Sequence, residues 1–241
     1  MHTTVGRAVG WLEATQEGLR DRVRLGQPVP TPIVCPPFVS LVPVRGLMDN
    51  QLMRLGAQNC HWEPEGPHTG EISPTMLRGI VDYVMVGHSE RRAAGETDDH
   101  IARKVTAITD AGLIPILFVG EEEPTPTAAD QSEQQLRHGL SGIDLNRHEV
   151  LVVYEPPWAI GADQAADPDH VRTEAERLKG LLRRFGASDP KVIYGGTVHD
   201  ENIEQFARLD ILDGVGATRA SLDSDRFLKM LDRIGRARAR P

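Results

Sequence analysis

The chain has 241 residues, 39% of them hydrophobic, and a formal net charge of −8, which suits one α/β domain spanning residues 1–241 and argues against nucleic acid as a main partner. No apolar run approaches the roughly 18 residues of a membrane span, and the N-terminus lacks the basic start and apolar core of a signal peptide. Cys35 and Cys60 show no CxxC spacing, so we expect reduced thiols, a cytoplasmic protein and no metal site.

The first half of the chain alternates helical patterns with short apolar strands. It opens on a helix, because apolar residues from Val5 to Leu19 recur at helical spacing and Thr3 or Thr4 can cap it. Strands are predicted at residues 33–35, 56–59, 83–86 and 115–119, and helical segments at 41–55, 74–80 and 100–111. Residues 60–73 are rich in Gly, Pro and His and are predicted to form a long loop.

The second half continues the alternation. Helices are predicted at residues 128–140, from Asp167-Pro168 to Gly186, at 202–209 and at 224–235, with strands at 150–154, 191–194 and 211–215. No change in composition marks a second domain. Short apolar strands without a period-2 pattern indicate parallel strands covered by helices.

Polar or glycine-rich residues follow most of the predicted strands. These clusters are Gln58-Asn59, His88-Ser89, Glu155, Gly195-Gly196-Thr197 and Thr218-Arg219. In a parallel barrel they would all lie at one rim, where active sites are found. An open doubly wound sheet is the alternative, but contributions from so many strands favour the barrel.

The segment 150–161, VLVVYEPPWAIG, combines a buried strand with an unusual loop. Glu155 ends the strand, two prolines follow, and Gly161 closes an apolar tip. A stiff entrance and a glycine exit suit a lid that folds over a carboxylate and excludes water. A rim loop with a solvated Glu155 is the alternative, and this segment alone favours neither.

Five motifs, taken together, resemble the triosephosphate isomerase family. They are AQN at Ala57–Asn59, TGEIS at Thr69–Ser73, GHSERR at Gly87–Arg92, YEPPWAIG at Tyr154–Gly161 and YGGTV at Tyr194–Val198. The likeness runs in the same order across nearly the whole chain. It implies a TIM (β/α)8-type barrel and a cytoplasmic enzyme of glycolysis and gluconeogenesis. The reaction implied is interconversion of dihydroxyacetone phosphate and D-glyceraldehyde 3-phosphate, without a cofactor.

The resemblance also implies roles for the residues of the long motifs. Glu155 matches the general base and His88 the neutral electrophile, which are the established roles in this family. Ser89 and Glu90 are expected to support them from the second layer, and Arg91 and Arg92 to form structural ion pairs. The alternative is a rim histidine at 88 followed by an ordinary helix cap.

The substrate phosphate is expected to bind backbone N–H groups in three loops. The residues are Gly161, Gly196, Thr197, Thr218 and Arg219, the last two preceding a short helix. Ordinary tight turns are the alternative explanation of these glycines. Loop 60–73 resembles the family's dimer loop, with Thr69 reaching the partner's active site, so we expect a homodimer. A mobile surface loop is the alternative.

The start of the chain departs from the family pattern. The family opens with a strand that ends in Asn-x-Lys-Met, whereas this chain begins at the Met. We therefore expect a barrel without its first strand and without the substrate-binding lysine. Our hypothesis is that the natural product starts upstream, which an intact-mass measurement on protein from the native cell would test. A chain that starts at Met1 is expected to isomerise its substrate many orders of magnitude more slowly.

Three further departures bear on substrate and lid. Thr218-Arg219 replaces two glycines, as in a branch of tetrulose-phosphate isomerases, which opens the alternative of a four-carbon (erythrulose) phosphate substrate. Phe118 stands where the family usually has Cys, and Pro157 should stiffen the lid. A catalytically dead barrel that binds sugar phosphates is the competing function from another class.

Overall fold

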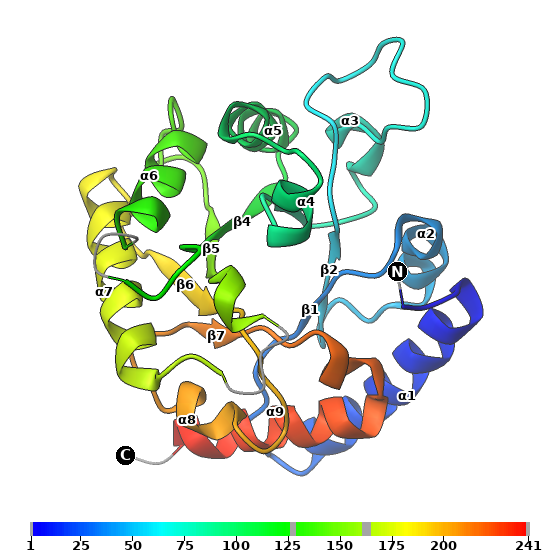
Figure 1. The fold of residues 1–241 in the computed structure, drawn as a ribbon. Helices are drawn as coiled ribbons and strands as arrows, with labels where there is room; N and C mark the ends of the chain where they lie inside the picture. Colours follow the sequence, from blue (N-terminus) through cyan, green and yellow to red (C-terminus); the bar gives the residue numbers. More distant parts are fainter. Residues whose placement is uncertain (1, 126–128, 161–164, 240–241) are drawn as a thin grey trace.

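A computed structural model describes residues 2–125, 129–160 and 165–239, which form one curled parallel sheet wrapped by helices (Figure 1). The seven strands, in sheet order, are β1 (Ile33–Val34), β2 (Arg54–Ala57), β3 (Tyr83–Val86), β4 (Ile114–Val119), β5 (Leu151–Tyr154), β6 (Lys191–Tyr194) and β7 (Gly214–Val215). Each strand pairs in parallel with its neighbour in sequence. This is a TIM-type barrel with one strand fewer than the full set, as the sequence predicts.

The helices lie outside the sheet. They are α1 (Val5–Arg24), α2 (Phe38–Leu47), α3 (Pro74–Leu77), α4 (Ser89–Ala93), α5 (Asp98–Asp110), α6 (Ala129–Gly139), α7 (Pro168–Arg184), α8 (Ile203–Ala207) and α9 (Ser224–Ala239). Two short 3-10 helices, η1 (Pro157–Ala159) and η2 (Arg219–Leu222), belong to loops after strands. None of the helices in the described part of the chain is both long enough and apolar enough to cross a membrane.

Side chains of the strands alternate between two apolar regions. Leu117, Val152 and Val192 are fully buried against the helices, and each such burial is worth about 1.5–3 kcal/mol. Phe118 and Val153, their neighbours in sequence, point instead into a smaller cluster inside the barrel. The helical layer and the barrel interior are therefore separate parts of the core.

The helical layer is continuous where the sheet is not. Within the described residues β1 and β7 are the two edges of the sheet, and α1 packs on both α2 and α9 outside these edges (Figure 1). Thr4 caps α1 by accepting a hydrogen bond from the Arg7 N–H at 3.4 Å, as predicted. Arg22 of α1 holds Asp232 of α9 through two hydrogen bonds of 2.6 and 2.8 Å.

Several boundaries differ from the prediction. The helical pattern at 41–55 is α2, which starts at Phe38 and ends at Leu47, followed by a turn in which the Asp49 carboxylate accepts from the Gln51 N–H. Strand β2 therefore starts at Arg54, where the backbone N–H pairs with Pro32 O. Gln58-Asn59 lies beyond the strand instead of ending it. Helix α4 was not predicted as a segment of its own; the sequence suggested only a helix cap after His88, as the alternative explanation of that motif.

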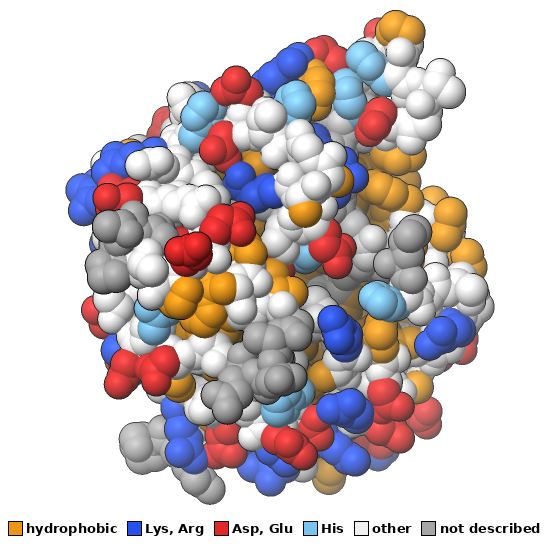
Figure 2. Space-filling view, viewed as in Figure 1, with side chains coloured by type: hydrophobic (Ala, Val, Ile, Leu, Met, Phe, Trp, Pro, Cys, Tyr) orange, Lys and Arg blue, Asp and Glu red, His pale blue; other side chains and the backbone are white. Residues whose placement is uncertain are grey.

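The long loop between β2 and α3 projects from the molecule (Figure 1). Large apolar side chains are exposed near its base, on α2 and α3, and Figure 2 shows apolar surface gathered there. They are Val39 (72% exposed), Val42 (64%), Leu47 (50%) and Met76 (59%).

Candidate active site

The carboxyl ends of the strands carry most of the predicted site residues to one rim. His88 follows β3, Glu155 follows β5, Gly196 follows β6 and Thr218 follows β7. Because all strands are parallel and in register, these positions lie at the same end of the sheet. The predicted convergence of the rim residues is therefore a consequence of topology.

His88 and Glu155 touch each other directly. The Nε2 of His88 lies 3.0 Å from Oε1 of Glu155, and the two side chains are only 15% and 5% exposed. The sequence places them 67 positions apart (155 − 88). They are thus close enough to act on neighbouring atoms of one small ligand.

The other ring nitrogen of His88 fixes the proton on Nε2. Nδ1 accepts a hydrogen bond from the backbone N–H of Glu90 at 3.2 Å, in the first turn of α4. An acceptor at Nδ1 leaves Nε2 to carry the hydrogen and donate to Glu155. Gly87 makes this turn possible: its φ is +76°, and a Cβ there would lie 3.2 Å from Phe118 O.

Two opposing influences set the pKa of His88. Burial acts to lower it, but the hydrogen bond and charge of Glu155 outweigh burial, and the nearby Glu90 adds to them, so the pKa of His88 is raised. The raised pKa depends on Glu155 remaining against the ring. The side chain of Phe118 packs on the same imidazole, with ring centroids 5.1 Å apart.

Backbone contacts hold Glu155 in this position. Its second oxygen, Oε2, accepts the backbone N–H of Ser89 at 3.0 Å, and its own N–H donates to Val119 O at 2.7 Å. Gly120 permits the close approach of β4, since a Cβ at that position would lie 2.2 Å from Glu155 O. A cavity of about 10 Å³, room for about one water, adjoins Glu155, Phe118 and Gly120.

Ser89 and Glu90 contact the site through their backbones. Their N–H groups bind Glu155 and His88 respectively, while the Glu90 side chain is exposed. Arg91 and Arg92 form the predicted ion pairs, Arg91 with Glu96 at 3.0 Å and Arg92 with Asp98 at 2.6 Å. Arg92 also donates to Gly87 O at 2.9 Å, so it braces the turn that carries His88.

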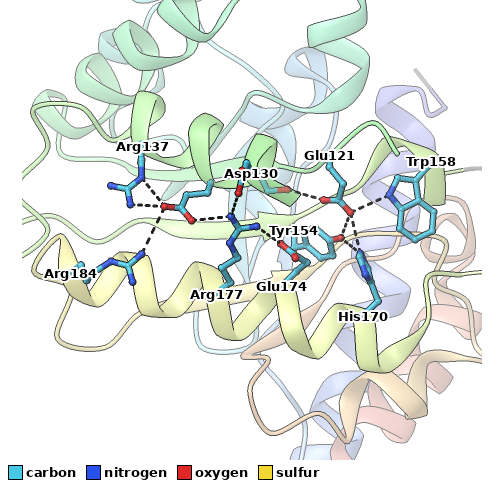
Figure 3. A network of polar contacts seen from close by, with 11 residues as sticks. Glu121, Asp130, Arg137, Tyr154, Trp158, His170, Glu174, Arg177 and Arg184 are labelled. Atoms are coloured by element: carbon cyan, nitrogen blue, oxygen red, sulfur yellow. Dashed lines mark hydrogen bonds and ion pairs between the residues drawn. The ribbon is translucent and has the colours of Figure 1, made fainter. Parts of the chain in front are cut away.

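The loop after β4 begins with a buried carboxylate that sequence reasoning missed. Glu121, 1% exposed, accepts a hydrogen bond from the Tyr154 hydroxyl at 2.5 Å and from Trp158 Nε1 at 3.2 Å, both at Oε1 (Figure 3). Its Oε2 accepts from Ser132 Oγ at 2.8 Å. The available signal was position, because Gly120-Glu121 follows a buried strand as the other rim clusters do.

Tyr154 remains a hydrogen-bond donor in this environment. Burial, then the charge of Glu121 and the hydrogen bond to it, raise the pKa of Tyr154 far above its usual range. The Tyr154 hydroxyl thus keeps its proton and donates it in a hydrogen bond to Glu121. Tyr154, which directly precedes Glu155, and Trp158 of η1 therefore bind the same carboxylate.

The loops after β6 and β7 carry the predicted phosphate-binding residues. The Thr197 N–H and hydroxyl both donate to Ala159 O, at 3.1 and 2.7 Å, which joins this loop to η1. Gly196 lies against Tyr194, where a Cβ would be 2.0 Å from the hydroxyl. Thr218 and Arg219 are exposed at the start of η2. Gly161 lies outside the described residues.

Gln58 and Asn59 have structural contacts at the rim. Gln58 Nε2 donates to Cys35 O at 2.8 Å, and Asn59 Oδ1 accepts from the buried Lys104 ammonium at 2.8 Å. Cys35 and Cys60 are both free thiols. Among the described residues no three His, Cys, Asp or Glu side chains gather as a metal site would require.

Comparison with known proteins agrees with this geometry. A sequence profile described as triosephosphate isomerase matches residues 1–234. The chain is 38% identical over 211 residues to a protein named triosephosphate isomerase from Dehalococcoides mccartyi, covering 82% of this chain and 81% of that protein. Proteins of the same name from Carboxydothermus hydrogenoformans (38% over 237 residues, 94% and 92% covered) and Roseiflexus castenholzii (37% over 241 residues, 96% and 93%) are similar along almost their whole length.

Proposed function

Since this chain belongs to the triosephosphate isomerase family, we propose that it is an isomerase that interconverts dihydroxyacetone phosphate and D-glyceraldehyde 3-phosphate through an enediolate. The observation that carries the proposal is the 3.0 Å contact between His88 Nε2 and Glu155 Oε1 at the strand-end rim. A base and a hydrogen-bond donor in contact are what proton transfer next to a carbonyl requires. The relatives' shared name supports the three-carbon substrate, and the four-carbon alternative has no such support.

In the proposed mechanism the Glu155 carboxylate takes a proton from C1 of dihydroxyacetone phosphate. The electron pair moves into the C1–C2 bond, and the carbonyl oxygen on C2 gains negative charge, which the His88 Nε2–H stabilises. The same carboxyl then delivers a proton to C2, while the hydroxyl proton on O1 passes to O2. This gives the aldehyde at C1 with no net change in protons.

The substrate must separate His88 from Glu155 before this can happen. Glu155 gives up its contacts with the imidazole and with the Ser89 N–H when it turns to the substrate carbon. Burial, which lowers the pKa of His88, is then no longer opposed by the adjacent carboxylate. The Glu90 N–H still occupies Nδ1, so His88 acts as a neutral Nε2–H donor.

We assign phosphate binding to the loops after β6 and β7. Gly196 allows the backbone to approach a ligand closely, and Arg219 supplies an exposed guanidinium that can bind an anion at two points. Thr197 N–H and Oγ1 both donate to Ala159 O, so their use by phosphate requires η1 to move. Gly161 completes this proposed set.

We further propose that the protein is a homodimer in the cytoplasm. The projecting loop 60–73 and the exposed side chains of Val39, Val42 and Met76 offer an apolar surface beside the rim. The free thiols of Cys35 and Cys60 suit a reducing compartment.

The decisive experiment is steady-state isomerisation by protein purified from its own cells, with Glu155→Gln and His88→Gln introduced into the gene. We expect turnover of dihydroxyacetone phosphate, a loss of at least about 10³-fold in kcat for Glu155→Gln and about 10²-fold or more for His88→Gln. Glu149→Gln, an exposed acid that precedes β5, is the matched control and should retain full activity. Absent turnover in the wild-type protein, or full activity in Glu155→Gln, would overturn the proposal.

A further inference from the structure

His170 makes a third contact with the buried carboxylate of Glu121. Its Nε2 lies 3.1 Å from Glu121 Oε1 and 2.9 Å from the Tyr154 hydroxyl oxygen (Figure 3). Its ring also meets the indole of Trp158 edge-on, with centroids 5.6 Å apart and planes at 68°. His170 belongs to the first turn of α7, where its backbone N–H donates to the Asp167 side chain. It therefore contacts both of the other side chains, Tyr154 and Trp158, that donate to Glu121 Oε1.

The position of the proton on His170 follows from its two neighbours. Ionised Glu121 can only accept hydrogen bonds, and Tyr154 already gives its single hydroxyl proton to Glu121. Neither group can donate to Nε2, so we assign a hydrogen to Nε2 and a donated bond to Glu121. The His170 side chain is 31% exposed, so water reaches the ring.

The surroundings make this donor important. Within the described residues His170 is the one basic side chain within ion-pair distance of Glu121. The groups that face it are Glu121 at the end of β4, Tyr154 on β5 and the buried Glu174 on α7. Burial, and then the charge of Glu121, raise the pKa of Glu174. The surroundings of His170 are thus acidic. Arg177 lies 3.9 Å from the other acid, Glu174.

We propose that His170 is a positioning residue that holds the Glu121 carboxylate by donating from Nε2, and thereby fixes Tyr154 and Trp158 on the two sides of Glu155. Tyr154 immediately precedes Glu155, and Trp158 lies three positions after it (158 − 155). The catalytic part of the inference rests on the proposed isomerase function, whereas the contact itself does not.

A spectroscopic test needs no enzymatic activity. The chain has three Trp residues, so protein labelled with 5-fluorotryptophan gives three fluorine resonances, and Trp158→Phe identifies the one of interest. We expect the Trp158 resonance to broaden in His170→Phe, where the Glu121 carboxylate that accepts the Trp158 indole N–H is no longer held by a donor, and to stay sharp in His170→Gln, which keeps an N–H donor.

Two controls make this result specific. His138→Phe removes a histidine–carboxylate contact of the same kind, with Asp99 at 2.7 Å, and should leave the Trp158 resonance unchanged. Trp11, which packs on Phe227 and donates to Ser221 O, serves as an internal reference in every variant. A Trp158 resonance that is as sharp in His170→Phe as in the wild-type protein would overturn the proposal.

Kinetics test the catalytic part of the inference. His170→Phe removes the donor and should lower kcat by about tenfold with a smaller change in KM, the loss of one hydrogen bond to a charged group. His170→Gln keeps an N–H donor and should restore kcat to within about threefold. Wild-type kcat in His170→Phe would refute the catalytic part. An inactive wild-type protein whose Trp158 resonance still broadens in His170→Phe would refute the isomerase function and leave the positioning contact standing.

Discussion

His88 and Glu155 illustrate how much of a catalytic pair can be predicted from sequence. Their residue types and their places after two strands are visible in the chain, and parallel topology brings them together at 3.0 Å. The carboxylate of Glu121 was not assigned a role, because its partners come from β5, η1 and α7 and no local pattern links them. Contacts that join distant segments through side chains depend on exact packing, which a single sequence does not display.

At this scale the raised pKa of His88 predicts a pH-dependent stability. A group whose pKa is higher in the folded state stabilises the fold below its unfolded value, about 6.5, and loses that contribution as pH rises through the folded pKa. The free energy of unfolding of the wild-type protein should therefore fall, relative to His88→Gln, as the pH rises above about 6.5. The pair can contribute at most about 1.5–3 kcal/mol, the value of a charged hydrogen bond.

Denaturant titrations at several pH values would measure this difference. Glu155→Gln should remove the same pH dependence, and the double variant should remove no more than either single one. If the free energy of unfolding of Glu155→Gln still falls with rising pH as in the wild-type protein, another group is responsible.

At the scale of elements, the existence of each strand was predicted more reliably than its first and last residues. The apolar runs that became β3, β5 and β6 were located within one residue of their observed ends. Strand β2 was displaced, because the apolar residues before it read as a continuation of helix α2 and the Asp49 turn between them was overlooked. The loop ends of strands are set by such turns and by close contacts between neighbouring backbones.

Gly120 tests the importance of one such contact. Replacing it with Ala would place a Cβ 2.2 Å from Glu155 O and 2.7 Å from Pro156 Cα. We expect Gly120→Ala to lower kcat and to destabilise the fold by about 1–3 kcal/mol, since backbone must move. Gly10→Ala is the control: its Cβ meets nothing within 4 Å on the exposed face of α1, and it should stabilise the fold by about 0.5–1 kcal/mol. Kinetics and thermal unfolding together would show whether both variants behave in this way.

At the scale of the whole molecule, the fold class was predictable and the assembly is still a proposal. Alternation of strands and helices predicted a parallel barrel, and the family resemblance implied that its first strand is missing. The strand order β1 to β7 agrees with both expectations. Exposure could not be predicted, since the helical pattern at 41–55 does not tell which apolar side chains are covered, and Val39 and Val42 of α2 are 72% and 64% exposed. Only the packed structure shows which apolar side chains lack a partner.

The proposed dimer gives a prediction for this surface. Val42→Asp places a charge in the apolar patch and should convert a species of twice the chain mass into monomer, because burying an unpaired charge is costly. Val23→Asp alters another exposed valine, 58% exposed near the end of α1, and should leave the mass unchanged. Sedimentation equilibrium over a range of concentrations measures both. A wild-type protein that sediments as a monomer at all concentrations would contradict the assignment.

The contact between α1 and α9 has a consequence for how the protein is made. Leu12 and Leu19 of α1 are buried, Trp11 packs on Phe227 with ring centroids 5.2 Å apart, and Arg22 binds Asp232. Arg22 and Asp232 are 210 positions apart, so the apolar side of α1 has to wait in the nascent chain for its α9 partner until more than 200 further residues have been made. A ribosome that stalls before α9 is made would release a chain in which this apolar face of α1 is exposed, and chaperones would bind it.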